Sequence, residues 1–497
     1  CGHDGPESQS DLGQKKNFLQ FSRSQAVSYM EYYDSLSADK GEERENERYQ
    51  LVTSFDQTVE QASGAVGNDA EPFGIEYRLD TLNCFVLLVI SAVAAVVTPY
   101  MRQSVAREIS APRHNLFYGV YLLALTGLLG IAATGDAFNI YVFMEISSLA
   151  SYVLIGLGSS RRARAAAFQY LIMGTIGATF LLIGIGLLYM MTGTLNLADL
   201  SQRVAKVPDM RPIYAAFAFI TVGILIKLAL FPLHIWLPNA YTYAPSAVSA
   251  FLAASATKVG AYVLLRFVFT LFGPEFSFER MPLMEILMPL SLIAILVGSG
   301  VAIFQHDLKR LFAYSSIGQI GYIALGISFA STSGLTGAIV HIFNHAMMKG
   351  GIFLALGCMM YRTGSVELSA LHGLGRRMPF TMAALIIGGL GLVGVPLTSG
   401  FVSKWYLVQA ALEADLWPVA LLILLGSLVA LIYVGRVIEA AYFRPPPPGA
   451  PAVREAPWQM LIPTWILLAA SLYFGVHTDI TVSVAERGAE MLLGLPA

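Results

Sequence analysis

Hydrophobic and polar residues are segregated into long blocks along this chain. Residues 1–79 are polar and rich in charge, and from Leu82 onward the sequence becomes a series of apolar segments. Each segment is about 20 residues long, the length of a helix that crosses a hydrocarbon core of about 30 Å. The twelve approximate cores are 82–101, 115–134, 138–158, 167–191, 214–238, 248–273, 286–304, 311–329, 334–360, 380–411, 416–442 and 458–476. Because lipid offers no partner for open backbone groups, we expect an all-α fold of about twelve transmembrane helices.

The division predicts three regions. A polar N-terminal segment at 1–79, soluble or poorly ordered, precedes a transmembrane domain at 80–478, and 479–497 form a C-terminal tail. Loops on one side of the predicted membrane hold thirteen Lys and Arg residues, and those on the other side hold four. Cytoplasmic loops collect such residues, so the richer side is predicted to be cytoplasmic and both termini to face outward.

Composition changes this picture little. Apolar residues make up 56% of the chain and charged residues 13%, as expected for a protein that lies in a bilayer. A net charge of −2, without a basic patch, argues against a nucleic-acid partner. Three scattered cysteines and the lack of a dinucleotide-binding glycine fingerprint predict no cofactor and no metal.

Ionisable side chains inside the apolar segments are the strongest functional signal. A charge at the bilayer centre costs about 2.5 to 3.5 kcal/mol on insertion scales, so such residues are candidates for transport. They are Glu145, Lys227, Lys258 and Lys404, together with His341, His345 and Lys349, which are spaced four and four on one helical face. A buried lysine can both take up and release a proton, and a glutamate can stabilise its charged form. The pattern therefore predicts a proton relay.

Proline interrupts two of the segments that carry these residues. Pro232 follows Lys227 by five positions, and Pro396 precedes Lys404 by eight. Broken helices at corresponding places in two inverted repeats indicate a transporter site near the midplane. The freed backbone groups at such breaks can also hold water.

Less specific interpretations remain open at this point. Lys404 lies near a span end and could extend to the interface, and Glu145 could be a structural partner of a buried lysine. The histidines could be packed, hydrogen-bonded residues, although a relay with Lys349 is preferred to a metal site. Arg266 and His234 lie close to span ends, where anchoring is at least as plausible as transport.

Four motifs resemble the proton-conducting, antiporter-like membrane subunits, a superfamily that includes the D-type subunit of Mrp cation/proton antiporters and the pumping subunits of NADH:quinone oxidoreductase. The motifs are FMEISSLASYVL, IKLALFPLHIWLPNAYTYAPSAVSAFLAASATKVGAYVLLR, HIFNHAMMKGGIFLALG and GVPLTSGFVSKW. The resemblance covers roughly 74–478, and the stretch HIWLPNAYTYAPSAVSAFLAASATKVG looks most like the D-type Mrp subunit.

The resemblance implies two inverted five-helix repeats, at about 115–273 and 286–442. Glu145 and Lys227 then correspond to the pair at which the proton path begins, Lys258 to the central lysine and Lys404 to the exit. His341, His345 and Lys349 match the connecting helix. The family has fourteen helices, and its first two are expected before FGIEYRLD, where this chain has its polar segment.

Three functions remain as hypotheses. The first is a component of a multisubunit Mrp antiporter, like its D-type subunit, in the bacterial plasma membrane, which imports protons to export Na⁺ or K⁺ and is not an enzyme itself. The second is a proton-pumping membrane subunit of an NADH:quinone oxidoreductase or a membrane hydrogenase. The third is a structural subunit whose path is broken. The first two imply partner subunits in the bilayer.

Overall fold

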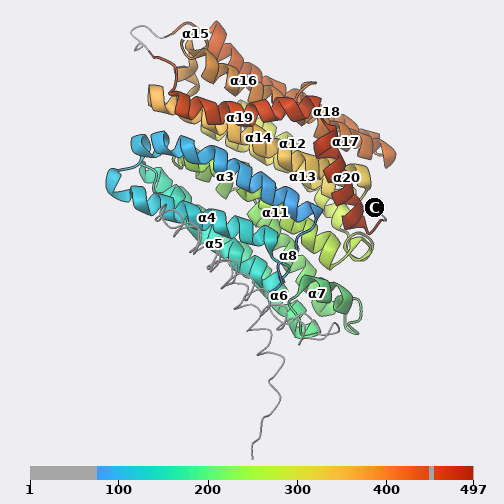
Figure 1. The fold of residues 1–497 in the computed structure, drawn as a ribbon. Coiled ribbons are helices and arrows are strands. Elements are labelled where there is room, and N and C mark those ends of the chain that lie inside the picture. The colour runs from blue at the N-terminus through green and yellow to red at the C-terminus, as the bar shows by residue number, and fades with distance from the viewer. Residues whose placement is uncertain (1–74, 447–452, 496–497) are drawn as a thin grey trace, which may run out of the picture. The chain divides into compact units, whose positions relative to one another are not determined.

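The computed structural model describes residues 75–446 and 453–495, so nearly all of the polar segment predicted at 1–79 lies outside the described residues. Within the described ranges every regular element is a helix (Figure 1). The helices of the first part are α3 (Thr81–Glu108), η1 (Ala111–Arg113), α4 (His114–Ala133), α5 (Ala137–Gly156), α6 (Arg161–Thr192), α7 (Leu197–Val204), α8 (Arg211–Leu228), α9 (Trp236–Tyr243), α10 (Ser246–Ala254), α11 (Ala256–Leu265), η2 (Arg266–Leu271) and η3 (Phe276–Arg280). Those of the second part are α12 (Leu283–Ile303), α13 (Leu308–Ser328), α14 (Thr332–Thr363), η4 (Leu368–Leu371), α15 (Leu374–Arg377), α16 (Pro379–Val393), α17 (Ser399–Glu413), α18 (Trp417–Ile438), η5 (Glu439–Phe443), α19 (Trp458–Val476) and α20 (Asp479–Leu493).

The spans agree with the apolar pattern. Eleven helices of the described chain are long and apolar enough to cross a membrane. The twelfth expected segment, at 380–411, consists of the two shorter helices α16 and α17. At 1.5 Å per residue, the 15 residues of α16 extend only about 22 Å, so α16 and α17 are needed together to cross a core of about 30 Å. The predicted all-α membrane fold is confirmed.

Two of the helix breaks lie where proline predicts them. Helix α8 ends before Ala229, whose backbone is left-handed with φ 60°, and α9 begins only at Trp236. Helix α16 ends before Gly394, which is left-handed with φ 86°, and α17 begins at Ser399. A third break, at Ser255 between α10 and α11, has no proline and was not expected.

The two halves of the bundle repeat one another. Helices α5 and α13 both begin at an aspartate, Asp136 or Asp307, whose side chain accepts a hydrogen bond from the backbone N–H three residues later. Asp136 also forms an isolated antiparallel bridge with Asn196, and Asp307 forms one with Glu367 at the same offset along the chain. Five crossings, from α4 through α10–α11, precede α12, so the second half starts from the opposite side of the predicted membrane. This is the arrangement expected of inverted repeats.

Helix α14 occupies the centre of the bundle. It packs against α3, α10, α13, α16, α17, α19 and α20, and Figure 1 shows it running beneath α19. Every residue of its most apolar 18-residue window is buried, whereas the corresponding windows of α4 and α6 are 39% buried. The central position of α14 places its ionisable residues between the two halves.

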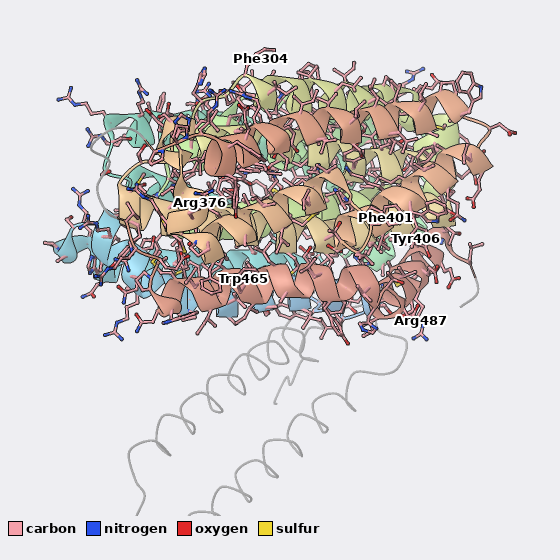
Figure 2. All side chains as sticks on the ribbon, turned by 90° about the horizontal axis from the view of Figure 1, so that it is seen from above. Phe304, Arg376, Phe401, Tyr406, Trp465 and Arg487 are labelled. Carbon is pink, nitrogen blue, oxygen red and sulfur yellow. The ribbon has the colours of Figure 1, made fainter. Side chains whose placement is uncertain are left out.

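Within the stretch 479–497, expected as a tail, residues Asp479–Leu493 form the helix α20. Its buried residues recur on one helical face, which packs on α3 and α14. The hydroxyl of Tyr406 on α17 donates to Glu486 Oε1 of α20 at 3.3 Å, and Figure 2 shows Tyr406 near the end of the bundle where Arg487 of α20 lies. A transmembrane pattern could not indicate this helix because it is short and charged.

Candidate proton-translocation site

Lys227 and Glu145 form a largely buried ion pair. Lys227 is the penultimate residue of α8, and its Nζ donates to Glu145 Oε1 at 3.0 Å and to Ser148 Oγ at 2.8 Å. Glu145 and Ser148 are three residues apart on α5 and therefore share one face of that helix. Lys227 is 7% exposed and the Glu145 side chain 22%. The pairing expected from the sequence is present, and it offsets the desolvation of both charges.

Lys258 lies on α11, which packs against α8, and it has no carboxylate partner among the described residues. The break at Ser255 frees carbonyl groups at the end of α10, and Lys258 Nζ donates a hydrogen bond to the Ala253 carbonyl. Thr257 Oγ1 lies 3.4 Å from the same nitrogen. With 1% of its surface exposed, Lys258 is held by neutral oxygens alone.

The two histidines and the lysine of α14 follow one face of the helix, as their spacing predicts. His341 Nδ1 lies 2.8 Å from Ser403 Oγ, and the ring centroids of His341 and His345 are 6.0 Å apart. Lys349 Nζ donates to the Phe312 carbonyl at 2.7 Å and to the hydroxyl of a serine on α13. All three are fully buried.

Lys404 caps the broken end of α16. Its Nζ donates to the carbonyls of Leu392 at 2.9 Å and Val393 at 3.0 Å, and to Ser427 Oγ at 2.9 Å. It also lies 4.5 Å from the centre of the Tyr322 ring. A cation at a helix C-terminus is stabilised by the partial negative charge of the open carbonyls. Lys404 is 6% exposed, so the side chain points into the protein rather than toward the interface.

One structural rule connects three of these lysines. Lys227 lies at the end of α8, Lys258 bonds to the end of α10, and Lys404 bonds to the end of α16. Each of these helix ends is a break within a segment that crosses the bundle, where carbonyl groups lose their helical partners. At the ends of α10 and α16 such oxygens accept hydrogen bonds from Lys258 and Lys404 without fixing the ammonium charge as a carboxylate would, whereas Lys227 bonds to Glu145. The arrangement at Lys258 and Lys404 can therefore hold a lysine in either protonation state.

Several buried polar atoms near these residues have no hydrogen-bond partner in the described protein. They include both ring nitrogens of His345, Nε2 of His341 and Oδ1 of Asn344. Buried polar groups are rarely left unpaired, and ordered water commonly satisfies them. These atoms are suited to bind a short file of water along α14, and such a file can carry protons.

Residues 134–430 match a family model described as NADH:quinone oxidoreductase/Mrp antiporter, TM. The chain belongs to this family. Every candidate residue from Glu145 to Lys404 lies within the matched range. The predicted membership of the antiporter-like superfamily is confirmed, and the protein is a multi-pass membrane protein of the antiporter or NADH:quinone oxidoreductase type.

Relatives of both types resemble the chain over most of its length. It is 43% identical to the N-type subunit of NADH-quinone oxidoreductase from Desulforudis audaxviator (strain MP104C) over 428 residues, which cover 83% of this chain and 84% of that protein. It is 30% identical to the D-type subunit of the Na⁺/H⁺ antiporter from Bacillus subtilis (strain 168), with 86% of each covered. A chain in the structure of the Mrp complex from Dietzia sp. DQ12-45-1b superposes with a TM-score of 0.77 at 25% identity, covering 84% of this chain and 85% of that one.

Two buried cations in this member of the family were not recognised from the sequence. Arg266, for which the sequence left interfacial anchoring and transport open, is 5% exposed and donates to Asp80 Oδ1 and Oδ2 at 2.5 and 2.7 Å and to the Asn83 side chain. Its Nε donates to Tyr262 Oη at 3.1 Å. The only local signal is the four-residue spacing from Lys258 to Tyr262 to Arg266, because the partners Asp80 and Asn83 lie far away in the sequence.

Lys309 is the second of these cations. Its position in the sequence predicts a cytoplasmic loop charge, but the structure places it in the first turn of α13 with 2% of its surface exposed. Its Nζ donates to the Ala244 carbonyl at 3.0 Å, at the end of α9. Nearby, Glu108 accepts hydrogen bonds from the backbone N–H of Ser246 at 2.9 Å and from its hydroxyl. Lys309 and Glu108 thus cap the two helix ends on either side of Pro245.

Among residues 75–446 and 453–495 no group of three or more His, Cys, Asp and Glu side chains is arranged to hold a metal ion.

Proposed function

We propose that this chain is the proton-conducting subunit of a multisubunit monovalent cation/proton antiporter and corresponds to the D-type subunit of Mrp complexes. One observation carries this proposal: four lysines are buried, namely Lys227, Lys258, Lys349 and Lys404. Among the described residues only one carboxylate, that of Glu145, bonds to any of them. A structural role alone gives no reason to bury four cations at this desolvation cost.

The residues have distinct roles in the proposed path. Glu145 holds the proton on Lys227 while the pair is closed, and separation of the pair removes that stabilisation, so the proton moves toward Lys258. Lys258 passes it to the face of α14 that carries His345, His341 and Lys349. Lys404 is the last proton carrier in this chain. Water bound by the unpaired polar atoms of α14 supplies the intervening links.

Coupling to a cation requires neighbouring subunits. The proposed partners are the other subunits of a hetero-oligomeric complex in the bacterial plasma membrane, and the transported cation is Na⁺ or K⁺. The comparison with the Mrp complex structure supports a multisubunit setting.

Transport by the native complex in inside-out membrane vesicles tests this function. With a pH gradient imposed, addition of Na⁺ or K⁺ should collapse the gradient in vesicles that contain the complex, and vesicles from a strain that lacks this subunit should not respond. An equal response in both kinds of vesicle would reject the antiporter function.

A second candidate is a proton-pumping subunit of a redox-driven complex. The identity of 43% to the N-type subunit of an NADH-quinone oxidoreductase, compared with 30% to the antiporter relative from Bacillus subtilis, favours it. The same relay would then be driven by electron transfer in other subunits. Purification of the complex from native membranes separates the candidates, because flavin and iron–sulfur subunits would accompany the chain only in the second.

A further inference from the structure

Gln319 lies on α13, between the lysine of α14 and the lysine of α17. It is 1% exposed, and its Nε2 lies 3.5 Å from the Leu392 carbonyl. The same carbonyl oxygen accepts the hydrogen bond of Lys404 Nζ at 2.9 Å. The amide of Gln319 and the ammonium of Lys404 therefore meet at one oxygen, at the broken end of α16.

The face of α13 that carries Gln319 also reaches Lys349. Ser315, Gln319 and Tyr322 are spaced four and three apart, so they follow one side of the helix. The Ser315 hydroxyl accepts a hydrogen bond from Lys349 Nζ. The Tyr322 ring lies 4.5 Å from Lys404 Nζ. The two lysines thus contact opposite ends of a short polar stripe, and Gln319 is its middle residue.

The oxygen of the Gln319 amide has no hydrogen-bond partner in the described protein, although it is fully buried. His341 Nε2 is likewise unpaired, and the His341 ring lies 5.8 Å from the Tyr322 ring. A buried amide oxygen without a donor is destabilising, so a bound water is the expected partner. The unpaired Gln319 Oε1 and His341 Nε2 are polar groups that can bind such a water.

We propose that Gln319 holds a water molecule between Lys349 and Lys404 and is a positioning residue for the last proton transfer along the chain. This inference rests on the proposed proton path and adds a residue of α13 to it. The amide neither gains nor loses a proton. The amide orients a water molecule. This water accepts a proton from the side of Lys349 while the same water donates one toward Lys404, so charge and atoms balance at each transfer.

Proton flux in vesicles that contain the complete complex tests the inference. Gln319→Met preserves the length of the side chain but removes both polar groups, and we expect initial flux at least about tenfold lower. Gln319→Glu keeps an oxygen at the same position but adds a negative charge. That charge favours the ammonium form of the neighbouring lysines, so we expect the pH of half-maximal flux to rise.

Gln305→Met is the matched control. Gln305 follows α12, is partly exposed and donates to the Val301 carbonyl of its own helix at 3.0 Å, so this variant should transport at the wild-type rate. Recovery of each variant in the purified complex measures assembly. A purely structural role for Gln319 would lower this recovery without moving the pH profile.

The outcomes separate this inference from the proposed function. If Gln319→Met transports at the wild-type rate while Lys404→Ala is inactive, Gln319 has no role and the relay stands. If Lys404→Ala also transports normally, the proposed proton path itself is wrong. Should Gln319→Met fail to assemble, an assembled Gln319→Glu with wild-type rate and pH profile would overturn the inference.

Discussion

Lys227 Nζ and Glu145 Oε1 are 3.0 Å apart, although 82 residues separate them in the chain. The pair joins the last turn of α8 to the middle of α5, immediately before the break that ends α8. In the proposed path, separation of this pair sets whether Lys227 keeps its proton. The pair is therefore the first place to test the proposed path.

We predict that Glu145→Ala abolishes proton-coupled transport and leaves most of the assembly intact. The Glu145 side chain is partly exposed, and Ser148 still accepts a hydrogen bond from Lys227 in the variant. Flux in vesicles and recovery of the complex are the measurements. Glu413→Ala is a suitable control that should transport normally, because Glu413 lies at the end of α17 and accepts an exposed hydrogen bond from Gln409. Wild-type flux in Glu145→Ala would remove this residue from the mechanism.

Lys258 should be essential for transport yet dispensable for stability. We expect Lys258→Ala and Lys258→Met to abolish flux, because α10 and α11 carry no other Lys, His, Asp or Glu that could replace it. Replacement of buried ionic groups by apolar ones of similar size is often neutral or stabilising. The thermal midpoint of the purified Lys258→Met complex should therefore be equal to or above that of wild type. Wild-type flux would contradict the prediction, and a large loss of stability would show that the ammonium group is structural.

Lys404→Arg separates charge from proton release. Arginine keeps a positive charge and several donors for the Leu392 and Val393 carbonyls, but it does not deprotonate in proteins. We expect flux to fall by about 100-fold or more while the complex still assembles. Lys404→Ala should be equally inactive. A transporting arginine variant would show that Lys404 serves only as a fixed charge.

The ion pair between Arg266 and Asp80 should stabilise the fold. Asp80→Ala leaves a buried guanidinium without its carboxylate, a change that typically costs about 3 to 5 kcal/mol. We expect a clear decrease in the thermal midpoint of the purified complex. Glu275→Ala is the matched control, because its pair with Arg280 is exposed and such pairs contribute about 0 to 1 kcal/mol. Equal midpoints in the two variants would rule out a stabilising role for the buried pair.

The apolar pattern predicted the helices, and it marked most residues of the candidate site, because both depend on local sequence. Each span needs its own run of apolar residues, and a lysine inside such a run is visible without knowledge of its neighbours. Pro232 and Pro396 likewise marked two breaks in advance. The position of α14 at the centre of the bundle agrees with its three buried ionisable residues, His341, His345 and Lys349, which are costly to expose to lipid.

Features that have no clear local signal in the sequence could not be predicted. The break at Ser255 has no proline, and its open carbonyl is satisfied by Lys258 only in the folded chain. Lys309 lies two residues after Asp307 at a span boundary, where the sequence predicts a charge in a loop. Tertiary packing instead buries it against α9. The water-binding role proposed for Gln319 depends on the end of α16, more than 70 residues later.

The burial of α14 limits how the lipid bilayer can act on its buried ionisable side chains. The side chains of His341, His345 and Lys349 are fully buried, so acyl chains do not touch them. In the proposed path, bilayer thickness can then influence proton movement there only by shifting the surrounding helices, among them α3, α10 and α19.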